Sequence, residues 1–195
     1  MFGRTLAPAL AVGNATVLKP AEDACATSLG LAELATEAGI PPGVLNVVTG
    51  RGSVAGAALT SHPGVDFISF TGSPEVGQTV QKAAADRFVN CTLELGGKSP
   101  QVVFADADFD AAVPVIRRAI IQEAGQPCSA GSRVLVEQSA YEKFIEWPKP
   151  GFSALQAGPP PMDLDCGPLI NAKQNSRSGV YRPCARRGHR SCGRR

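Results

Sequence analysis

Short apolar runs alternate with longer stretches of helical periodicity along most of the chain. Runs rich in Val, Ile, Leu and Phe predict buried strands at 14–18, 44–48, 65–70, 92–95, 101–104 and 133–136. Between them, helices are predicted over 21–38, 53–61, 74–85, 109–124 and 140–146. Strands that alternate with helices in this way are typical of an α/β fold with a mostly parallel sheet.

Local signals mark the ends of several of these helices. Glu22 or Asp23 can cap the helix over 21–38, and Gly39 can end it. Its face carries Leu29, Leu31 and Leu34. Pro74 takes the first helical position, which proline favours.

Two segments depart from this pattern. Residues 147–151 place two prolines where a helix should continue, and residues 175–195 have no apolar period, so we expect that tail to be disordered. A shift of the reading frame would explain both segments.

Composition narrows the class of protein. The chain has 195 residues, of which 44% are hydrophobic and 18% charged, which is a globular profile. No run approaches the ~20 apolar residues of a membrane span, and the short run at 6–12 carries Pro8, so it is a weak secretion signal. The six cysteines are widely and irregularly spaced, which favours reduced thiols and a cytoplasmic location.

The net charge of +2 comes from the tail. Residues 176–195 hold seven arginines and no acidic residue, and the rest of the chain has 12 basic against 17 acidic residues. That acidic body favours no nucleic-acid partner, although the tail by itself could bind one. Cys184, His189 and Cys192 lack a fourth ligand, so no metal site is expected there.

Polar clusters follow the predicted strands at 19–22, 50–52, 71–73 and 94–97, where parallel sheets bind ligands. The segment 71–77 suits a phosphate at a helix start, or is a plain turn, and it is not a G-x-G-x-x-G fingerprint. Gly97-Lys98-Ser99 is not a P-loop, because Thr92 stands where that motif needs glycine.

Two side chains suggest catalysis. Glu94 lies in an apolar strand beside two glycines, which fits either a general base or a structurally partnered carboxylate. Cys128 lies in a loop of small residues, which fits either an accessible nucleophile or a small buried hydrophobe. We expect Cys25, Cys91 and Cys166 to be small buried hydrophobic residues.

Six segments, in order and spacing, resemble the aldehyde dehydrogenase family: PALAVGN (8–14), LKPAE (18–22), FTGS (70–73) with Gly77, LELGGKSP (93–100), GQPCSAGSR (125–133) and GPLI (167–170). The resemblance implies a Rossmann-like parallel sheet, incomplete here. Residues 1–95 would form part of a nucleotide-binding domain and 96–174 part of a catalytic domain.

The resemblance also implies a mechanism. Cys128 would be the nucleophile that forms a thiohemiacetal and then a thioester, and Glu94 would activate the water that hydrolyses the thioester. The backbone N–H of Cys128 would help to hold the oxyanion. The substrate would be a small-molecule aldehyde, and the full-length protein would form a homo-oligomer with no membrane or nucleic-acid partner.

The cofactor site follows from the same resemblance. Lys19 and Glu22 would bind the adenosine ribose, with NAD favoured over NADP by Glu22. The remaining contacts would be Gly52 and Gly56 on the adenine side, Gly72 and Ser73 at the pyrophosphate, Val76 against the adenine and Leu95 near the nicotinamide.

The chain departs from the family at several points. The second oxyanion donor lies upstream of Pro8 in the family, and Glu123 stands where the family usually has Asn. A second ribose-binding carboxylate and the oligomerisation strand lie beyond residue 174. The alternative interpretation is therefore an inactive fragment that binds nucleotide weakly at most.

Overall fold

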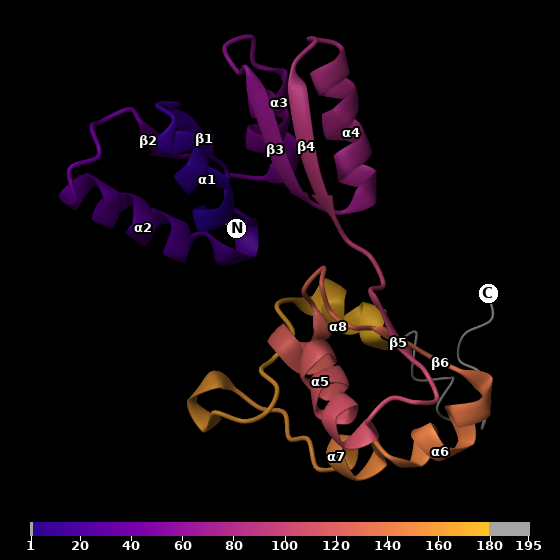
Figure 1. The fold of residues 1–195 in the computed structure, drawn as a ribbon. Coiled ribbons are helices and arrows are strands. Elements are labelled where there is room, and N and C mark those ends of the chain that lie inside the picture. Colours follow the sequence, from indigo (N-terminus) through magenta and orange to yellow (C-terminus); the bar gives the residue numbers. More distant parts are fainter. Residues whose placement is uncertain (1, 180–195) are drawn as a thin grey trace. The chain divides into compact units, whose positions relative to one another are not determined.

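The computed structural model describes residues 2–179, which form an α/β fold of parallel strand pairs and helices (Figure 1). The chain divides into two compact units, with the boundary between Leu95 and Gly96. Each unit is built around strands that pair in parallel, so the predicted α/β class with parallel strands is confirmed. The strands form three separate two-stranded sheets among the described residues.

The first strand pair of the N-terminal unit joins β1 (Thr16–Leu18) to β2 (Leu45–Val47), with Leu18 opposite Val47. Helix α2 (Ala26–Glu37) connects them, after a 3-10 turn at Glu22–Ala24. The carboxyl ends of β1 and β2 therefore lie at one edge, which brings the segments after Leu18 and Val47 together.

Helix α1 (Phe2–Ala11) precedes β1 and was not predicted, and it contains Pro8. Its Leu6 is buried, and the helix contacts β1. Burial of an apolar face thus outweighs the helix-breaking preference of a single proline.

The second strand pair joins β3 (Phe67–Gly72) to β4 (Asn90–Leu95), with Gly72 opposite Leu95. Helix α4 (Pro74–Ala85) connects them and lies along both strands, while α3 (Ala57–Ser61), preceded by a π-helical turn at Gly52–Gly56, contacts α4 (Figure 1). Ile68, Val80 and Ala84 form the core between sheet and helix. Pro74 opens α4, as the sequence predicted, and Ser73 caps it.

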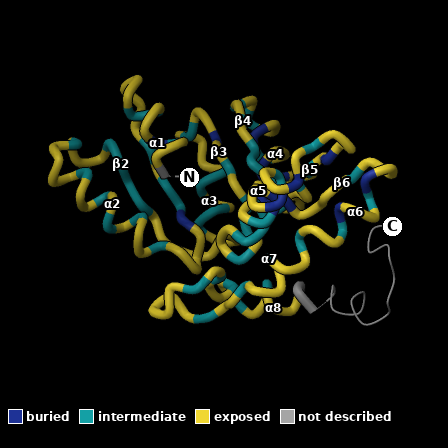
Figure 2. Tube along the Cα trace, turned by 60° about the horizontal axis from the view of Figure 1, so that its bottom comes forward, coloured by how far each residue is buried: buried dark blue, intermediate teal, exposed yellow. Residues whose placement is uncertain are grey.

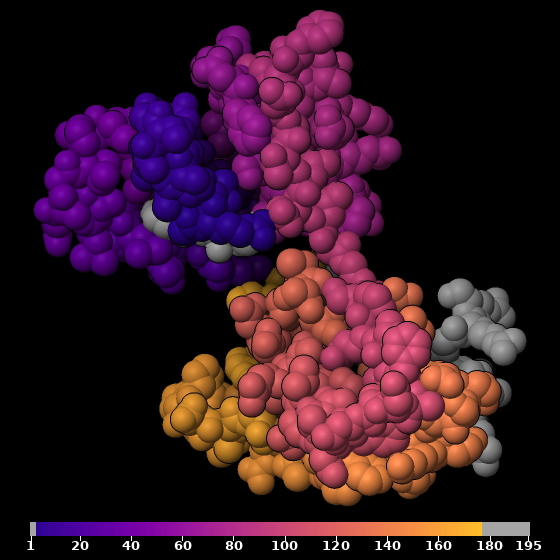
Figure 3. Space-filling model, in the orientation of Figure 1, coloured from indigo at the N-terminus to yellow at the C-terminus, as the bar shows by residue number. Residues whose placement is uncertain are grey.

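The C-terminal unit pairs β5 (Pro100–Val103) with β6 (Arg133–Val136), and α5 (Phe109–Ile121) connects them. Short helices follow: α6 (Tyr141–Glu146), α7 (Lys149–Ser153) and α8 (Ala172–Gly179). The core lies between α5, α6 and β5, where the Phe109 and Phe144 rings meet edge to face at 5.4 Å. In Figure 3 the atoms of residues near 100–125 lie beside those of the later orange segment within this unit.

The structure corrects two predictions, one for residues 147–151 and one for the start of the tail. The helix does stop at Glu146, as two prolines require, but α7 begins directly afterwards with Pro150 in its first turn, where proline is tolerated. Helix α8 extends to Gly179, past residue 175, where disorder was predicted to begin. The rest of the arginine-rich tail, with Cys184, His189 and Cys192, lies outside the described residues.

The core is small for a chain of this length. Eleven hydrophobic side chains are buried among the described residues, and Figure 2 shows them gathered at α4 and α5. Helix α2 buries none of its side chains, so the predicted face of Leu29, Leu31 and Leu34 stays largely exposed. In residues 2–179 no helix is both long and apolar enough to cross a membrane.

Candidate active site

A hollow of about 270 Å³ lies at the carboxyl ends of β1 and β2 in the N-terminal unit. Its lining comes from the turn after β1 and the turn after β2, namely Pro20, Ala21, Glu22, Cys25, Thr49, Gly50 and Arg51. Strand ends of a parallel pair are where α/β folds bind ligands, because loops from both strands converge there. The hollow therefore coincides with the predicted adenosine-ribose site.

Glu22 does not cap a helix, contrary to the prediction. Helix α2 begins at Ala26 without a side-chain cap, and Oε1 of Glu22 instead accepts the backbone N–H of Gly52 at 2.7 Å. This charge-assisted bond ties the two turns together. It engages one carboxylate oxygen and leaves the second oxygen to accept from a ligand.

Lys19 reaches the same turns. Its Nζ donates to the carbonyls of Pro20 at 2.6 Å and Gly50 at 3.2 Å. The side chain runs past Gly56, where an added Cβ would lie 3.5 Å from Cδ of Lys19. The structure thus brings together four predicted cofactor residues: Lys19, Glu22, Gly52 and Gly56.

The other predicted cofactor residues of this unit lie where β3 and β4 end. Gly72 closes β3 opposite Leu95, and Ser73 follows as the N-cap of α4, where its Oγ accepts the Val76 N–H at 3.4 Å. Val76 is 49% exposed on the first turn of α4. A Cβ at Gly77 would come within 2.6 Å of Leu95, so this glycine lets α4 lie against the strand end.

Glu94, the predicted general base, lies one residue before the end of β4. Its side chain is 42% exposed, and Oε1 forms an ion pair with Arg4 of α1 at 2.9 Å. The sequence offered no signal for this partner, because α1 itself was not predicted. Glu94 is thus a partnered carboxylate, with its second oxygen outside the ion pair.

Cys128, in the C-terminal unit, lies at the corner of a turn. The Ala130 N–H donates to the Pro127 carbonyl at 3.1 Å, which closes the turn around the cysteine. The thiol is free and exposed. Within the described part of the chain, the Cys128 N–H donates no hydrogen bond. An exposed thiol beside an unpaired N–H is the arrangement that a nucleophile with an oxyanion donor requires.

The turn is held by the segment that follows Glu94. Ser99 Oγ donates to the Cys128 carbonyl at 3.2 Å, and Nε of Arg133 donates to the Lys98 carbonyl at 2.8 Å. Gly131 lies buried against Gln101, whose Nε2 donates to the Gly131 carbonyl at 3.0 Å. Two motifs separated in the sequence are therefore joined directly.

Gln126 connects a third motif to the same turn. Its Nε2 donates to the Glu123 carbonyl at 2.8 Å, and its Oε1 accepts the Ile170 N–H at 3.0 Å. Sequence reasoning assigned no role to Ser99, Gln126 or Arg133, although each stands inside a motif. Their position inside those motifs was the one signal in the sequence that could have identified them.

The other cysteines differ from Cys128. Cys25, Cys91 and Cys166 are partly buried rather than fully buried, so the expected buried role holds only in part. Burial raises the pKa of the Cys91 thiol, which reduces its thiolate fraction near neutral pH. Among the described residues no group of three or more His, Cys, Asp or Glu is placed to hold a metal ion.

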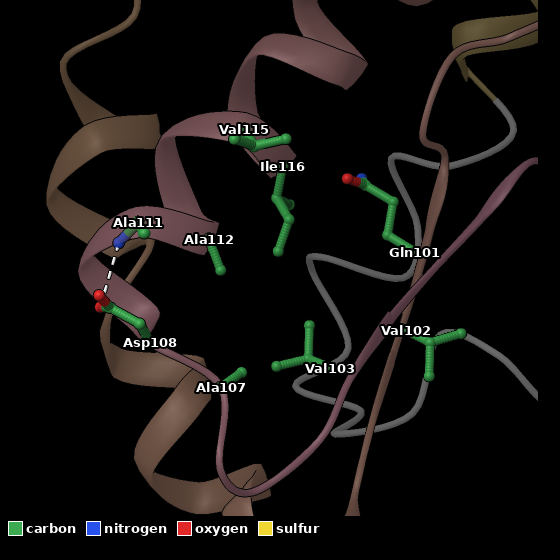
Figure 4. A pocket seen from close by; sticks show the side chains of 9 residues that line it. All are labelled: Gln101, Val102, Val103, Ala107, Asp108, Ala111, Ala112, Val115 and Ile116. Atoms are coloured by element: carbon green, nitrogen blue, oxygen red, sulfur yellow. Dashed lines mark hydrogen bonds between the residues drawn. The ribbon is translucent and has the colours of Figure 1, made fainter.

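A second hollow, in the C-terminal unit, does not have Cys128 among its lining residues. It measures about 460 Å³ and lies between β5 and α5, where Val103, Ala112 and Ile116 converge (Figure 4). Asp108 at its rim caps α5 by accepting the N–H of Ala111 at 3.2 Å. Most of its lining is apolar, and it includes neither Cys128 nor Glu94, so it is not the candidate site.

Comparisons with known proteins point to one family. The sequence matches the aldehyde dehydrogenase family over residues 1–187. It is 51% identical to human retinal dehydrogenase 2 over 146 residues, which cover 74% of this chain and 28% of that protein. The chain therefore spans about a third of the length of the curated relatives that it matches.

Solved structures show the same fold. Betaine aldehyde dehydrogenase from Staphylococcus aureus, in complex with NAD+, superposes with a TM-score of 0.87 at 38% identity, covering 93% of this chain and 36% of that one. An NADP-dependent enzyme from E. coli superposes with a TM-score of 0.88 at 40% identity, covering 91% and 37%. The family match, the level of identity and the shared fold show that this chain belongs to the aldehyde dehydrogenase family, a family of oxidoreductases.

Proposed function

We propose that this chain carries part of the catalytic machinery that oxidises a small-molecule aldehyde to a carboxylic acid with NAD(P). The observation that carries the proposal is the exposed Cys128 thiol at a turn that three family motifs hold in place. Family membership supports the reaction class. We further propose a cytoplasmic location and a homo-oligomeric full-length protein.

The first step would be attack of the Cys128 thiolate on the aldehyde carbonyl to give a thiohemiacetal. Negative charge then develops on the former carbonyl oxygen, and the unpaired N–H of Cys128 is available to stabilise it. Ser99 and Gln126 would keep the turn in this geometry through their hydrogen bonds. NAD(P), when bound, would accept the hydride that the thiohemiacetal loses as it becomes a thioester.

Hydrolysis of the thioester would release the carboxylic acid and regenerate the thiol. Glu94 would accept a proton from the attacking water through a carboxylate oxygen. Arg4 would hold the Glu94 side chain by its ion pair at 2.9 Å. The two predicted catalytic residues belong to different units of the chain.

The residues of the N-terminal unit fit a dinucleotide. The free carboxylate oxygen of Glu22 can accept from ribose hydroxyl groups, and the hollow beside it is open. The first turn of α4 offers backbone N–H groups to a pyrophosphate, and Ser73 retains a hydroxyl proton to donate. We therefore propose Lys19, Glu22, Gly52 and Gly56 at the adenosine, and Gly72, Ser73, Val76 and Leu95 along the rest of the cofactor.

The test is aldehyde-dependent NADH or NADPH formation by the purified chain, followed at 340 nm. We expect Cys128→Ala to abolish turnover and Glu94→Gln to slow it by about 10²-fold or more, because each removes a chemical step. Cys166→Ala is the matched control and should keep the activity. Turnover that survives Cys128→Ala would contradict the mechanism, and absence of turnover in the wild type would favour an inactive nucleotide-binding fragment.

A further inference from the structure

The hollow at the ends of β1 and β2 is lined by two residues of opposite charge. Glu22 lines it from the turn after β1, and Arg51 lines it from the turn after β2. Oxygen Oε1 of Glu22 is bound to the Gly52 N–H at 2.7 Å. Over residues 2–179, the Arg51 guanidinium makes neither a hydrogen bond nor an ion pair.

Most other arginines of the described chain are engaged. Arg4 pairs with Glu94, Arg87 donates to the carbonyls of Thr60 and Val65, and Arg133 donates to that of Lys98. The nearby cation Lys19 is also occupied, because its Nζ donates to two backbone carbonyls. Arg51 is therefore the cation at this hollow whose charge remains available.

The backbone of Arg51 is held firmly although its side chain is not. Its carbonyl accepts the N–H groups of Val54 at 3.0 Å and Ala55 at 2.9 Å, which anchors the residue at the start of the π-helical turn. A fixed backbone with an unpaired guanidinium presents a cation at the rim without the loss of an existing bond.

The two charges have different preferences for a ribose. A carboxylate accepts hydrogen bonds from the 2′- and 3′-hydroxyl groups and repels a 2′-phosphate, whereas a guanidinium binds a phosphate in a bidentate geometry. We propose that Arg51 is a specificity residue that lets this hollow accept an adenosine 2′-phosphate despite Glu22. The proposal rests on the nucleotide site proposed above and predicts dual use of NAD and NADP.

The test compares two ligands that differ only in the 2′-phosphate. Binding of adenosine 5′-monophosphate and adenosine 2′,5′-bisphosphate to the full chain is measured by calorimetry. In the wild type we expect the two affinities to agree within about tenfold. In Arg51→Ala we expect the bisphosphate affinity to fall by at least about tenfold and the monophosphate affinity to change by less than about threefold.

Matched variants separate local from general charge effects. Arg118→Ala removes an exposed arginine from α5 and should leave both affinities unchanged. Glu22→Gln should raise the affinity for the bisphosphate, because it removes the repelling charge while keeping the shape of the side chain.

The outcomes distinguish the two proposals. Absence of monophosphate binding would overturn the nucleotide site and this inference together. Monophosphate binding with a bisphosphate affinity that Arg51→Ala leaves unchanged, or that is already far weaker in the wild type, would overturn the role of Arg51 alone.

Discussion

Three consecutive residues ahead of the Cys128 turn adopt left-handed backbone conformations. Their φ angles are 44° at Glu123, 55° at Ala124 and 73° at Gly125. Glycine takes this conformation without strain, and Asn tolerates it, but Glu and Ala are each strained by roughly 1 kcal/mol. Glu123 and Ala124 therefore store backbone strain beside the candidate nucleophile.

Replacing Glu123 by Asn should relieve part of that strain. We expect Glu123→Asn to raise the free energy of unfolding by about 0.5–1 kcal/mol, measured by denaturant titration. Glu142→Asn on α6 is the control, since it makes the same change in a helix, where Asn is slightly unfavourable. Equal effects of the two substitutions would show that φ at Glu123 is not the cause.

At the scale of elements, Gly131 lets the cysteine loop lie against β5 and α5. A Cβ there would overlap the Gln101 amide, at 2.7 Å from its Cδ, and would approach Ala119 Cβ to 3.1 Å. We expect Gly131→Ala to lower the free energy of unfolding by about 1–3 kcal/mol. Gly167→Ala, where nothing lies within 4 Å, is the control and should change it by less than about 0.5 kcal/mol. A loss no larger than that of the control would contradict this view of the loop.

Glu137 joins the end of β6 to the loop after β5. Its carboxylate accepts the Ser139 hydroxyl at 2.7 Å and the Ala105 N–H at 2.9 Å, and these hydrogen bonds lower the pKa of Glu137 below its ordinary value of 4.5. A carboxyl whose pKa is lower in the folded state stabilises the fold above its unfolded pKa. That contribution is lost as the pH falls through the lowered folded pKa.

Acid sensitivity should therefore depend on this residue. Between about pH 6 and pH 3, Glu137→Gln should lose less thermal stability than the wild type, because the pH-dependent contribution is gone. Melting temperatures across this range provide the measurement, and Glu142→Gln on α6 is the control, expected to follow the wild type. A wild-type pH profile in Glu137→Gln would exclude this role.

At the scale of the whole molecule, more large hydrophobic side chains are exposed than buried among the described residues. Val102 and Val115 are 58% and 62% exposed, and both line the apolar hollow of Figure 4. Exposed apolar patches of this kind drive association between chains. We expect the 20.2 kDa chain to self-associate, with an apparent mass in light scattering that rises with concentration.

A double substitution locates the responsible surface. Val102→Lys with Val115→Lys should lower the apparent mass, because it places charges across the hollow. Val12→Lys changes an exposed valine that does not line this hollow and should leave the apparent mass unchanged. Association that is insensitive to the double substitution would assign it to another surface.

Sequence patterns predicted the elements better than their packing. Helix α4 and strand β6 have the predicted bounds, because Pro74 and a β-branched apolar run are strong local signals. Helix α1 was not predicted, since the run at 6–12 was weighed only as a secretion signal, and its packing against β1 was not visible in the sequence. The leucines of α2 were predicted to share one face, and that face is exposed, since periodicity states which residues share a face but not what covers it.

The linear order of residues was enough to identify the strands, most helices and the chemical groups of the candidate site, because propensity, capping and motif spacing act over a few residues. The tertiary structure determined which distant residues form hydrogen bonds with these groups. Glu22 accepts from Gly52, Ser99 donates to Cys128 and Gln126 accepts from Ile170 across 30, 29 and 44 positions. Such pairs form only when the tertiary structure brings distant segments together, as parallel strands do for the loops at their ends, and no local pattern encodes that meeting.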